Sequence, residues 1–123
     1  MSVSKTILVV DDDPGFLYLL KETLEENKFR CITAESAGEA LEKAKLEEPD
    51  LILLDLMLPV MSGHGLIRAF KNNPRFADIP VIVLSALTDG EVAVEMIEQG
   101  AVNYLSKACN AEELLETVRQ YAA

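Results

Sequence analysis

Hydrophobic residues along the chain follow two alternating patterns, short apolar runs and longer stretches with helical spacing. The runs at residues 7–10, 51–54 and 81–84 are apolar at every position, and two more mixed segments lie at 30–34 and 102–105. Fully apolar runs are typical of parallel strands that helices cover on both faces. The stretches between them predict helices. The pattern therefore predicts a doubly wound (βα)5 unit of α/β class, with the more polar segment 30–34 at an edge.

Capping residues indicate where the predicted helices begin and end. The first helix has Phe16, Leu17, Leu20 and Leu24 on one apolar stripe, and Pro14 suits its first turn. Gly100 is expected to end the fourth helix. Expected N-cap residues of the second to fifth helices are Ser36, Ser62, Thr88 and Asn110.

The length and net charge of the chain limit the classes of protein to which it can belong. At 123 residues, of which 50% are hydrophobic, the chain is expected to form one domain, residues 1–123, with a sizeable core. The 21 Asp and Glu against 11 scattered Lys and Arg argue against direct binding of nucleic acid. No apolar run is long enough for a membrane span. Cys31 and Cys109 lack metal-ligand spacing, so we expect two small core residues and a cytoplasmic protein.

Three acidic residues, Asp11, Asp12 and Asp13, follow the first apolar run directly. In a doubly wound sheet this is the edge where ligands bind, near the switch in strand order. Crowded carboxylates repel one another, and a hard cation such as Mg²⁺ relieves that repulsion. The alternative is an acidic N-cap on the first helix, for which Asp13 alone would suffice. Because three acids exceed the need of a cap, we favour the metal site.

Three later strands end near further polar residues, namely Asp55, Ser85 and Lys107. Each has a simple structural alternative. Asp55 could be only a turn or cap residue, and Ser85 could start the turn before the fourth helix. Lys107 could be a solvated surface lysine. Tyr104 is either an ordinary edge-strand aromatic or a ring that changes position with the site. Because the carboxyl ends of parallel strands share an edge, we expect an acid, a hydroxyl and an ammonium to converge on the first acidic cluster, an arrangement suited to a metal and a phosphoryl group.

Other kinds of site lack support in the sequence. The only histidine is His64, expected on the surface of the third helix, so no Ser/His/Asp or Cys/His arrangement is available. No glycine-rich phosphate loop follows the first strand, which argues against nucleotide binding.

Four segments, in their order and spacing, resemble the receiver domain of two-component response regulators. They read VVDDDP, LILLDLMLPVMSG, VIVLSA and YLSK, and the resemblance covers nearly the whole chain. It implies a flavodoxin-like sheet of order 2-1-3-4-5. It also implies a phosphoacceptor protein of a phosphorelay rather than an enzyme, with Asp55 as the phosphoacceptor. Dephosphorylation is expected to be self-catalysed and slow.

The resemblance assigns the metal site as well. Asp12 and Asp55 would bind Mg²⁺ directly, and Asp11 would act mainly through water. Met57 would contribute its backbone carbonyl.

The remaining assigned residues handle the phosphoryl group and the response. Lys107 would pair with the phosphoryl group, Ser85 would hold one of its oxygens, and Tyr104 would be the switch aromatic. The donor would be a histidine kinase or a histidine phosphotransfer protein. The face of the fourth helix, fifth strand and fifth helix would then change its affinity for a downstream partner. The chain is expected to be a stand-alone receiver or one separated from an output domain.

One residue departs from the family pattern. Ala108 follows Lys107 where the family usually has proline with a cis peptide bond before it. A cis bond before alanine costs about 2.5–4 kcal/mol. We therefore expect a trans or mixed Lys107–Ala108 bond and a Lys107 that is held less tightly.

Two alternative functions remain open on the sequence. Asp11-x-Asp13 resembles the acid pair of haloacid dehalogenase phosphatases, in which Asp11 would be the nucleophile, although residues 14–15 fit that motif poorly. A pseudo-receiver that only docks partners is the second alternative, and the complete acidic set argues against it.

Overall fold

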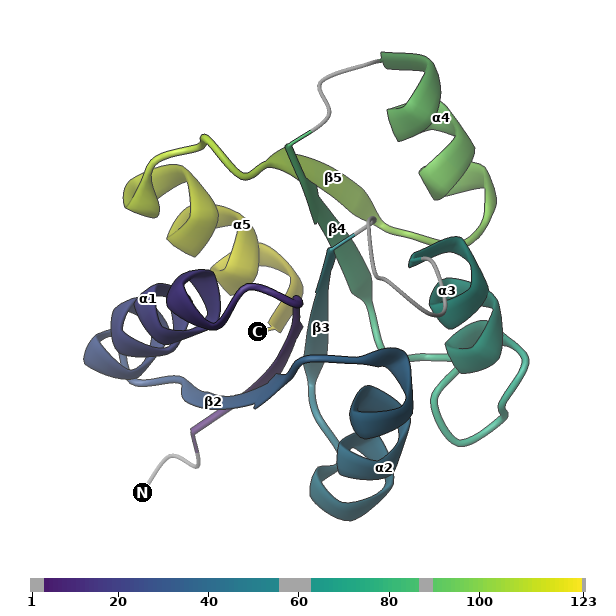
Figure 1. Ribbon diagram of the computed structural model, residues 1–123, viewed down its shortest axis with the longest axis horizontal. Coiled ribbons are helices and arrows are strands. Elements are labelled where there is room, and N and C mark those ends of the chain that lie inside the picture. The colour runs from purple at the N-terminus through teal and green to yellow at the C-terminus, as the bar shows by residue number, and fades with distance from the viewer. Residues whose placement is uncertain (1–3, 56–62, 87–89, 123) are drawn as a thin grey trace.

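Five parallel strands form one sheet in the order β2-β1-β3-β4-β5 (Figure 1). The computed structural model describes residues 4–55, 63–86 and 90–122. The strands are β1 (Thr6–Val10), β2 (Arg30–Ala34), β3 (Leu51–Asp55), β4 (Val81–Ser85) and β5 (Asn103–Ser106). The helices are α1 (Pro14–Glu26), α2 (Ala37–Glu47), α3 (Gly63–Lys71), α4 (Gly90–Glu98) and α5 (Ala111–Ala122). The predicted fold class, the strand order and the edge position of residues 30–34 are confirmed.

Each predicted strand boundary lies within one residue of the observed one. The last strand differs because it begins at Asn103 rather than at Val102. The backbone N–H of Val102 donates to the carbonyl of Val81 at 2.8 Å, but its side chain is 38% exposed.

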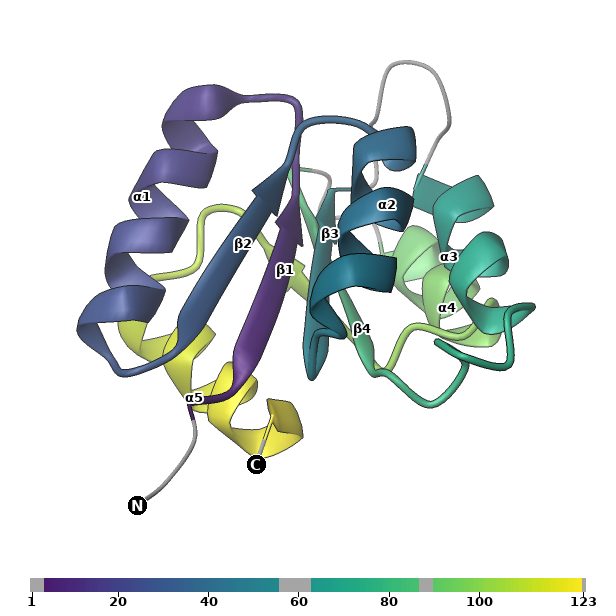
Figure 2. The same cartoon turned by 90° about the horizontal axis from the view of Figure 1, so that it is seen from below.

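The sheet separates two helical layers, with α1 and α5 on one face and α2, α3 and α4 on the other (Figures 1 and 2). Because successive side chains of a strand point to opposite faces, β1 and β3 supply both layers. Ile7 and Leu51 pack in the α1/α5 layer, whereas Leu8 and Ile52 pack in the layer of α2, α3 and α4. Residues 7–10, 51–54 and 81–84 are all buried, which explains the unbroken apolar runs in the sequence.

Local capping explains several helix ends. The Ser36 hydroxyl accepts from the backbone N–H of Glu39 at 3.2 Å, and Asn110 Oδ1 accepts from that of Glu113 at 2.8 Å. Gly100 follows α4 with a φ of 121°, a conformation that L side chains rarely adopt. The predicted caps Ser62 and Thr88 lie outside the described residues.

The two cysteines have different environments. Cys31 is 4% exposed and belongs to the α1/α5 layer, as expected. Cys109 is only partly buried but packs against the same layer, so it lies at the margin of the core rather than inside it. Its place in the loop between β5 and α5 accounts for the difference. In the described parts of the chain, we find no helix with the length and apolar character that crossing a membrane requires.

Candidate functional site

Sheet order places the ends of β1 and β3 side by side. Val10 is paired with Leu54, and the next residue of each chain segment is an aspartate, Asp11 or Asp55. Two acidic residues that are far apart in sequence therefore lie next to each other at the carboxyl edge of the sheet.

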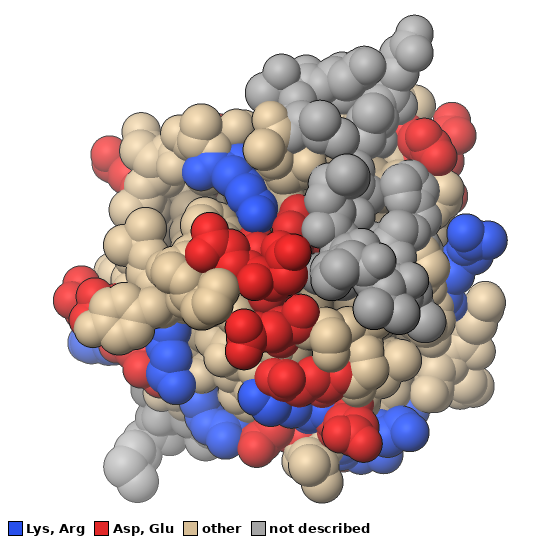
Figure 3. All heavy atoms as spheres, viewed as in Figure 1, with Lys and Arg blue, Asp and Glu red and all other residues tan. Residues whose placement is uncertain are grey.

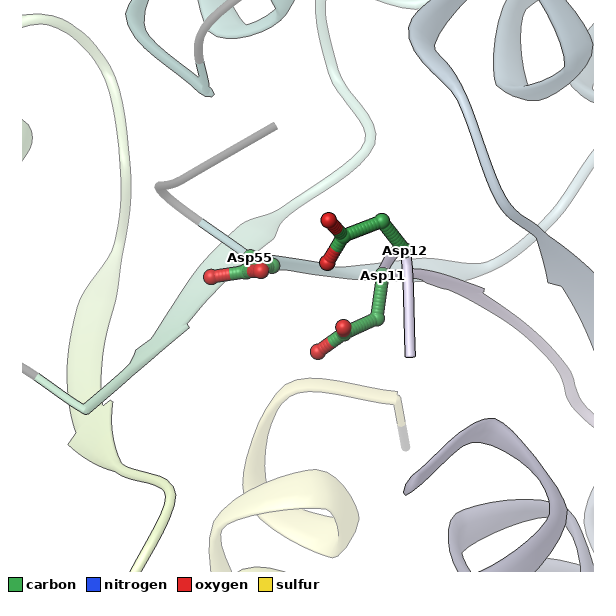
Figure 4. A group of neighbouring side chains, drawn as sticks. All are labelled: Asp11, Asp12 and Asp55. Carbon is green, nitrogen blue, oxygen red and sulfur yellow. The ribbon is translucent and has the colours of Figure 1, made fainter. Parts of the chain in front are cut away.

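Asp11, Asp12 and Asp55 form a cluster of carboxylates at this edge (Figure 4). One carboxylate oxygen from each lies within 4.8 Å of the other two. Asp11 and Asp55 are buried, whereas Asp12 is exposed. Three converging oxygen ligands, one of them open to solvent, suit Mg²⁺, which binds few carboxylates and keeps several waters. The residues present therefore fit this metal ion.

Asp13 has a different structural role from Asp11 and Asp12. Its Oδ1 accepts from the backbone N–H groups of Gly15 at 3.0 Å and of Phe16 at 3.4 Å, so it caps α1. Its own N–H donates to Asp11 Oδ1 at 2.9 Å. The N-cap alternative thus accounts for Asp13 only and leaves the other two acids for the cluster.

Lys107 brings a positive charge to the cluster. Its Nζ lies 2.6 Å from Asp11 Oδ2 and 3.4 Å from Asp55 Oδ2. Burial by itself lowers the pKa of the Lys107 ammonium, but the hydrogen bond to Asp11 and the two negative charges outweigh it, so the pKa is raised. Lys107 is therefore a permanent cation at neutral pH and partly neutralises the cluster.

Burial and the negative charge of Asp55 both raise the pKa of the Asp11 carboxyl. Loss of water raises the pKa of the Asp11 carboxyl. The hydrogen bonds from Lys107 and from the backbone of Asp13 oppose that rise without cancelling it. These two partners thus limit the rise of the Asp11 pKa that burial causes.

The loop that presents Lys107 has an all-trans backbone. Among the described residues no peptide bond is cis, so the bond between Lys107 and Ala108 is trans, one of the two expected forms. The N–H of Lys107 donates to the Ser85 carbonyl at 2.9 Å, and that of Ala108 donates to Ser106 Oγ at 3.0 Å. The expected loose placement of Lys107 is not observed, because two carboxylates hold its ammonium.

Ser85 and Tyr104 lie on the strands beyond Asp55. Asp55 is paired with Leu84, so Ser85 is one residue further along the neighbouring strand, where it is fully buried. Tyr104 lies inside β5 and packs against the layer of α2, α3 and α4. Ser85 therefore belongs to the same edge, and Tyr104 lies within the sheet behind it. Met57 lies outside the described residues, as does the side chain of His64.

Sequence reasoning missed one neighbour of the cluster. Phe16 was placed on the apolar stripe of α1, but its ring faces Lys107, with the ammonium nitrogen 4.8 Å from the ring centroid. Its position in the first turn after the acidic segment was the available signal.

Acidic side chains dominate the surface around the site. In Figure 3 they gather at the centre of the face and continue towards its lower rim, with basic side chains beside them. The net charge of −10 agrees with this view. Such a surface attracts cations to the edge where the carboxylates converge.

A scan against family models matches residues 7–119 to the response regulator receiver domain. The phosphate regulon transcriptional regulatory protein PhoB of Pseudomonas aeruginosa is 36% identical over 117 residues, which are 95% of this chain and 51% of that protein. Protein PilH of the same organism is 32% identical over 95% of this chain and 97% of its own length. The chain thus spans about half the length of PhoB and nearly all of PilH.

Solved structures give the same result. The chemotaxis response regulator CheY4 of Vibrio cholerae superimposes with a TM-score of 0.91 at 29% identity, over 97% of this chain and 99% of that one. The BeF3-activated N-terminal receiver domain of Klebsiella pneumoniae RstA has a TM-score of 0.90 at 28% identity, over 96% and 98%.

Proposed function

This chain belongs to the receiver domain family of response regulators, and from that premise we propose that Asp55 is the residue that accepts the phosphoryl group. The chain is a phosphoacceptor signalling domain of two-component systems and not an enzyme in its own right. One observation supports Asp55 above all others. It is the buried acid at the end of β3 whose carboxylate lies beside both a carboxylate cluster and the Lys107 ammonium.

Mg²⁺ is the metal ion proposed for this site. Asp12 and Asp55 would bind it directly, and Asp11, whose carboxylate is held by Lys107 and the Asp13 backbone, would act mainly through water. The Met57 carbonyl is a further proposed ligand. When bound, the ion supplies positive charge that stabilises the negatively charged phosphoryl oxygens.

The proposed chemistry is transfer to a carboxylate. An oxygen of Asp55 forms a bond to phosphorus while the bond from phosphorus to the donor's imidazole nitrogen breaks, and the imidazole leaves with that electron pair. The product is an acyl phosphate. The Lys107 ammonium, 3.4 Å from Asp55 Oδ2, is placed to pair with the transferred group. The Ser85 hydroxyl would donate a hydrogen bond to one phosphoryl oxygen.

The response is proposed to pass through β4 and β5. Ser85 ends β4, and Tyr104 in β5 packs against the helical layer that contains α4. A shift of Ser85 towards a bound phosphoryl group would change the space available to the Tyr104 ring. The face of α4, β5 and α5 would then alter its affinity for a downstream protein, as a shift between two populations.

The partners can be stated by class. Relatives include a sensor histidine kinase, TmoS of Ectopseudomonas mendocina, as well as transcriptional regulators. We propose a histidine kinase or a histidine phosphotransfer protein as donor, a cytoplasmic location, and residues 1–123 as one receiver domain. Nothing in the comparisons favours a phosphatase or a module that only docks partners.

Mass spectrometry after incubation with acetyl phosphate and Mg²⁺ tests the assignment. We expect one phosphoryl group on the wild-type chain and none on Asp55→Asn. Asp13→Asn is the matched control, because asparagine also caps a helix while one acid is removed from the same segment. That variant should be phosphorylated like the wild type.

Three results would overturn the proposal. A phosphoryl adduct that survives Asp55→Asn would mean that Asp55 is not the acceptor. An adduct located on Asp11 would support the phosphatase alternative. Hydrolysis of p-nitrophenyl phosphate by the wild type would do the same.

A further inference from the structure

The aromatic ring of Phe16 lies against the ammonium of Lys107. The nitrogen is 4.8 Å from the ring centroid, within the range of a cation–π interaction. Phe16 is held in place by the cap of α1, because its backbone N–H donates to Asp13 Oδ1 at 3.4 Å. The first turn of α1 therefore presents the ring to the ammonium that Asp11 and Asp55 contact.

The Lys107 side chain has two carboxylates and a cavity beside it. Its ammonium lies closer to Asp11, at 2.6 Å, than to Asp55, at 3.4 Å. On the other side, a cavity of about 140 Å³ between α1 and α5 is lined by Lys107, Phe16, Leu19 and Cys109. A lysine stem has four rotatable carbons, so an open space beside it gives the ammonium room to leave the carboxylates.

We propose that Phe16 is a positioning residue that holds the Lys107 ammonium over the carboxylate cluster and so speeds phosphoryl transfer. The inference rests on the proposed function, in which Lys107 pairs with the group that Asp55 receives. The negative face of the ring attracts the cation, and the ring forms part of the cavity wall next to the lysine stem. An aliphatic side chain would supply the wall without the attraction.

Three variants separate these contributions. Phe16→Leu removes the ring, Phe16→Tyr retains it, and Leu19→Ala alters the same cavity at a residue that is 58% exposed. The rate of phosphorylation by acetyl phosphate at saturating Mg²⁺ should fall about three- to tenfold in Phe16→Leu, as expected for loss of one cation–π contact. Phe16→Tyr and Leu19→Ala should stay within about twofold of the wild type. Equal rates in Phe16→Leu and Phe16→Tyr would overturn the proposal.

A second measurement does not depend on phosphorylation. Protons of the Lys107 ε-methylene near an aromatic face should show an upfield NMR shift, assigned by its loss in Lys107→Arg. We expect the shift in the wild type and in Phe16→Tyr, and its absence in Phe16→Leu. An unshifted wild-type resonance would overturn the inference even if Phe16→Leu does not fold. A wild type that shows the shift but accepts no phosphoryl group would contradict the proposed function and leave the placement of Lys107 supported.

Discussion

At the level of single residues, Lys107 is the cation that balances the buried carboxylates. It stands 2.6 Å from Asp11 and 3.4 Å from Asp55, two of the three acids that would approach a metal ion. In the proposed site, a metal ion and the ammonium would therefore compete for the same negative charge. The lysine would then weaken metal binding while it supports the proposed phosphoryl transfer.

Replacing Lys107 by methionine is expected to tighten binding of Mg²⁺ about tenfold at pH 8, because a positive charge a few ångströms from the ion is removed. Isothermal titration calorimetry measures the effect. Lys21→Met is the matched control, since it changes the net charge equally at an exposed position of α1. Distant surface charges are screened by salt, so that variant should bind like the wild type. Unchanged or weaker binding by Lys107→Met would contradict the competition.

The two cysteines should differ in reactivity. Burial raises the pKa of Cys31 from its ordinary 9.0 to about 12, and its side chain is 4% exposed. At pH 8 only about one Cys31 thiol in ten thousand would be ionised, and the thiolate is the reactive form. Cys109 also has a raised pKa from burial, but it is only partly buried.

In native buffer at pH 8, iodoacetamide should modify Cys109 slowly and leave Cys31 intact, whereas both should react in denaturant. Peptide mass spectrometry gives the two extents. Because the fold favours the protonated thiol, the stability that Cys31 contributes is present below pH 9 and is lost as the pH rises towards 12. Modification of Cys31 as fast as Cys109 in the folded protein would show that its burial is incomplete.

At the level of elements, the turn between α4 and β5 depends on a glycine. Gly100 has a φ of 121°, and a Cβ atom there would lie 2.9 Å from Lys71 Cγ. Lys71 cannot easily move aside, because its ammonium donates to the carbonyls of Ala77 and Ile79 at 3.1 and 2.9 Å. One lysine thus connects the end of α3, the segment before β4 and the end of α4.

Gly100→Ala should therefore lower the free energy of unfolding by about 2 kcal/mol or more, from backbone strain together with the steric contact. Chemical denaturation measures the change. Gly38→Ala is the opposite control, since apart from its chain neighbours and the backbone of α2 nothing lies within 4 Å of a Cβ at that position. That substitution should stabilise the protein by about 0.5–1 kcal/mol. A neutral result for Gly100→Ala would mean that the turn adjusts freely.

The sequence predicts elements better than it predicts contacts. Apolar runs locate β1, β3 and β4 to within one residue, because a strand covered on both faces has few polar positions inside it. The edge strands β2 and β5 are more polar and are located from their place between the predicted helices. Asp11, Asp12 and Asp55 could be assigned to one edge because strand ends meet there. The position of Phe16 in the first turn after the acidic segment places it near the site, but its contact with Lys107 depends on side-chain conformations that this signal does not fix. The degree of burial of Cys109, which packs at the margin of the core, could not be predicted either, because it depends on the path of the loop before α5.

On the scale of the whole molecule, the net charge of −10 disfavours the compact state, and much of it gathers around the carboxylate cluster (Figure 3). The electrostatic repulsion among these charges can be reduced in two ways. Any salt screens the general repulsion, whereas a bound metal ion neutralises the cluster itself.

MgCl₂ should therefore raise the melting temperature more than NaCl of equal ionic strength. At ten times its Kd a ligand contributes about 1.4 kcal/mol, which for a domain of this size corresponds to roughly 5 °C. Differential scanning calorimetry of the wild type and of Asp12→Asn checks the origin of the difference. The advantage of MgCl₂ should largely disappear in the variant, and its persistence there would point to a different metal site.

The alternation of side chains along β1 and β3 also governs how the domain comes apart. Each of these strands places one residue in one helical layer and the next residue in the other. Loss of α1 and α5, or of α2, α3 and α4, would expose the hydrophobic side chains on one face of β1 and β3. The helices that remain pack against the other face of these same strands. Neither layer is thus a foldon of its own, and denaturation is expected to be all-or-none, without a half-unfolded intermediate.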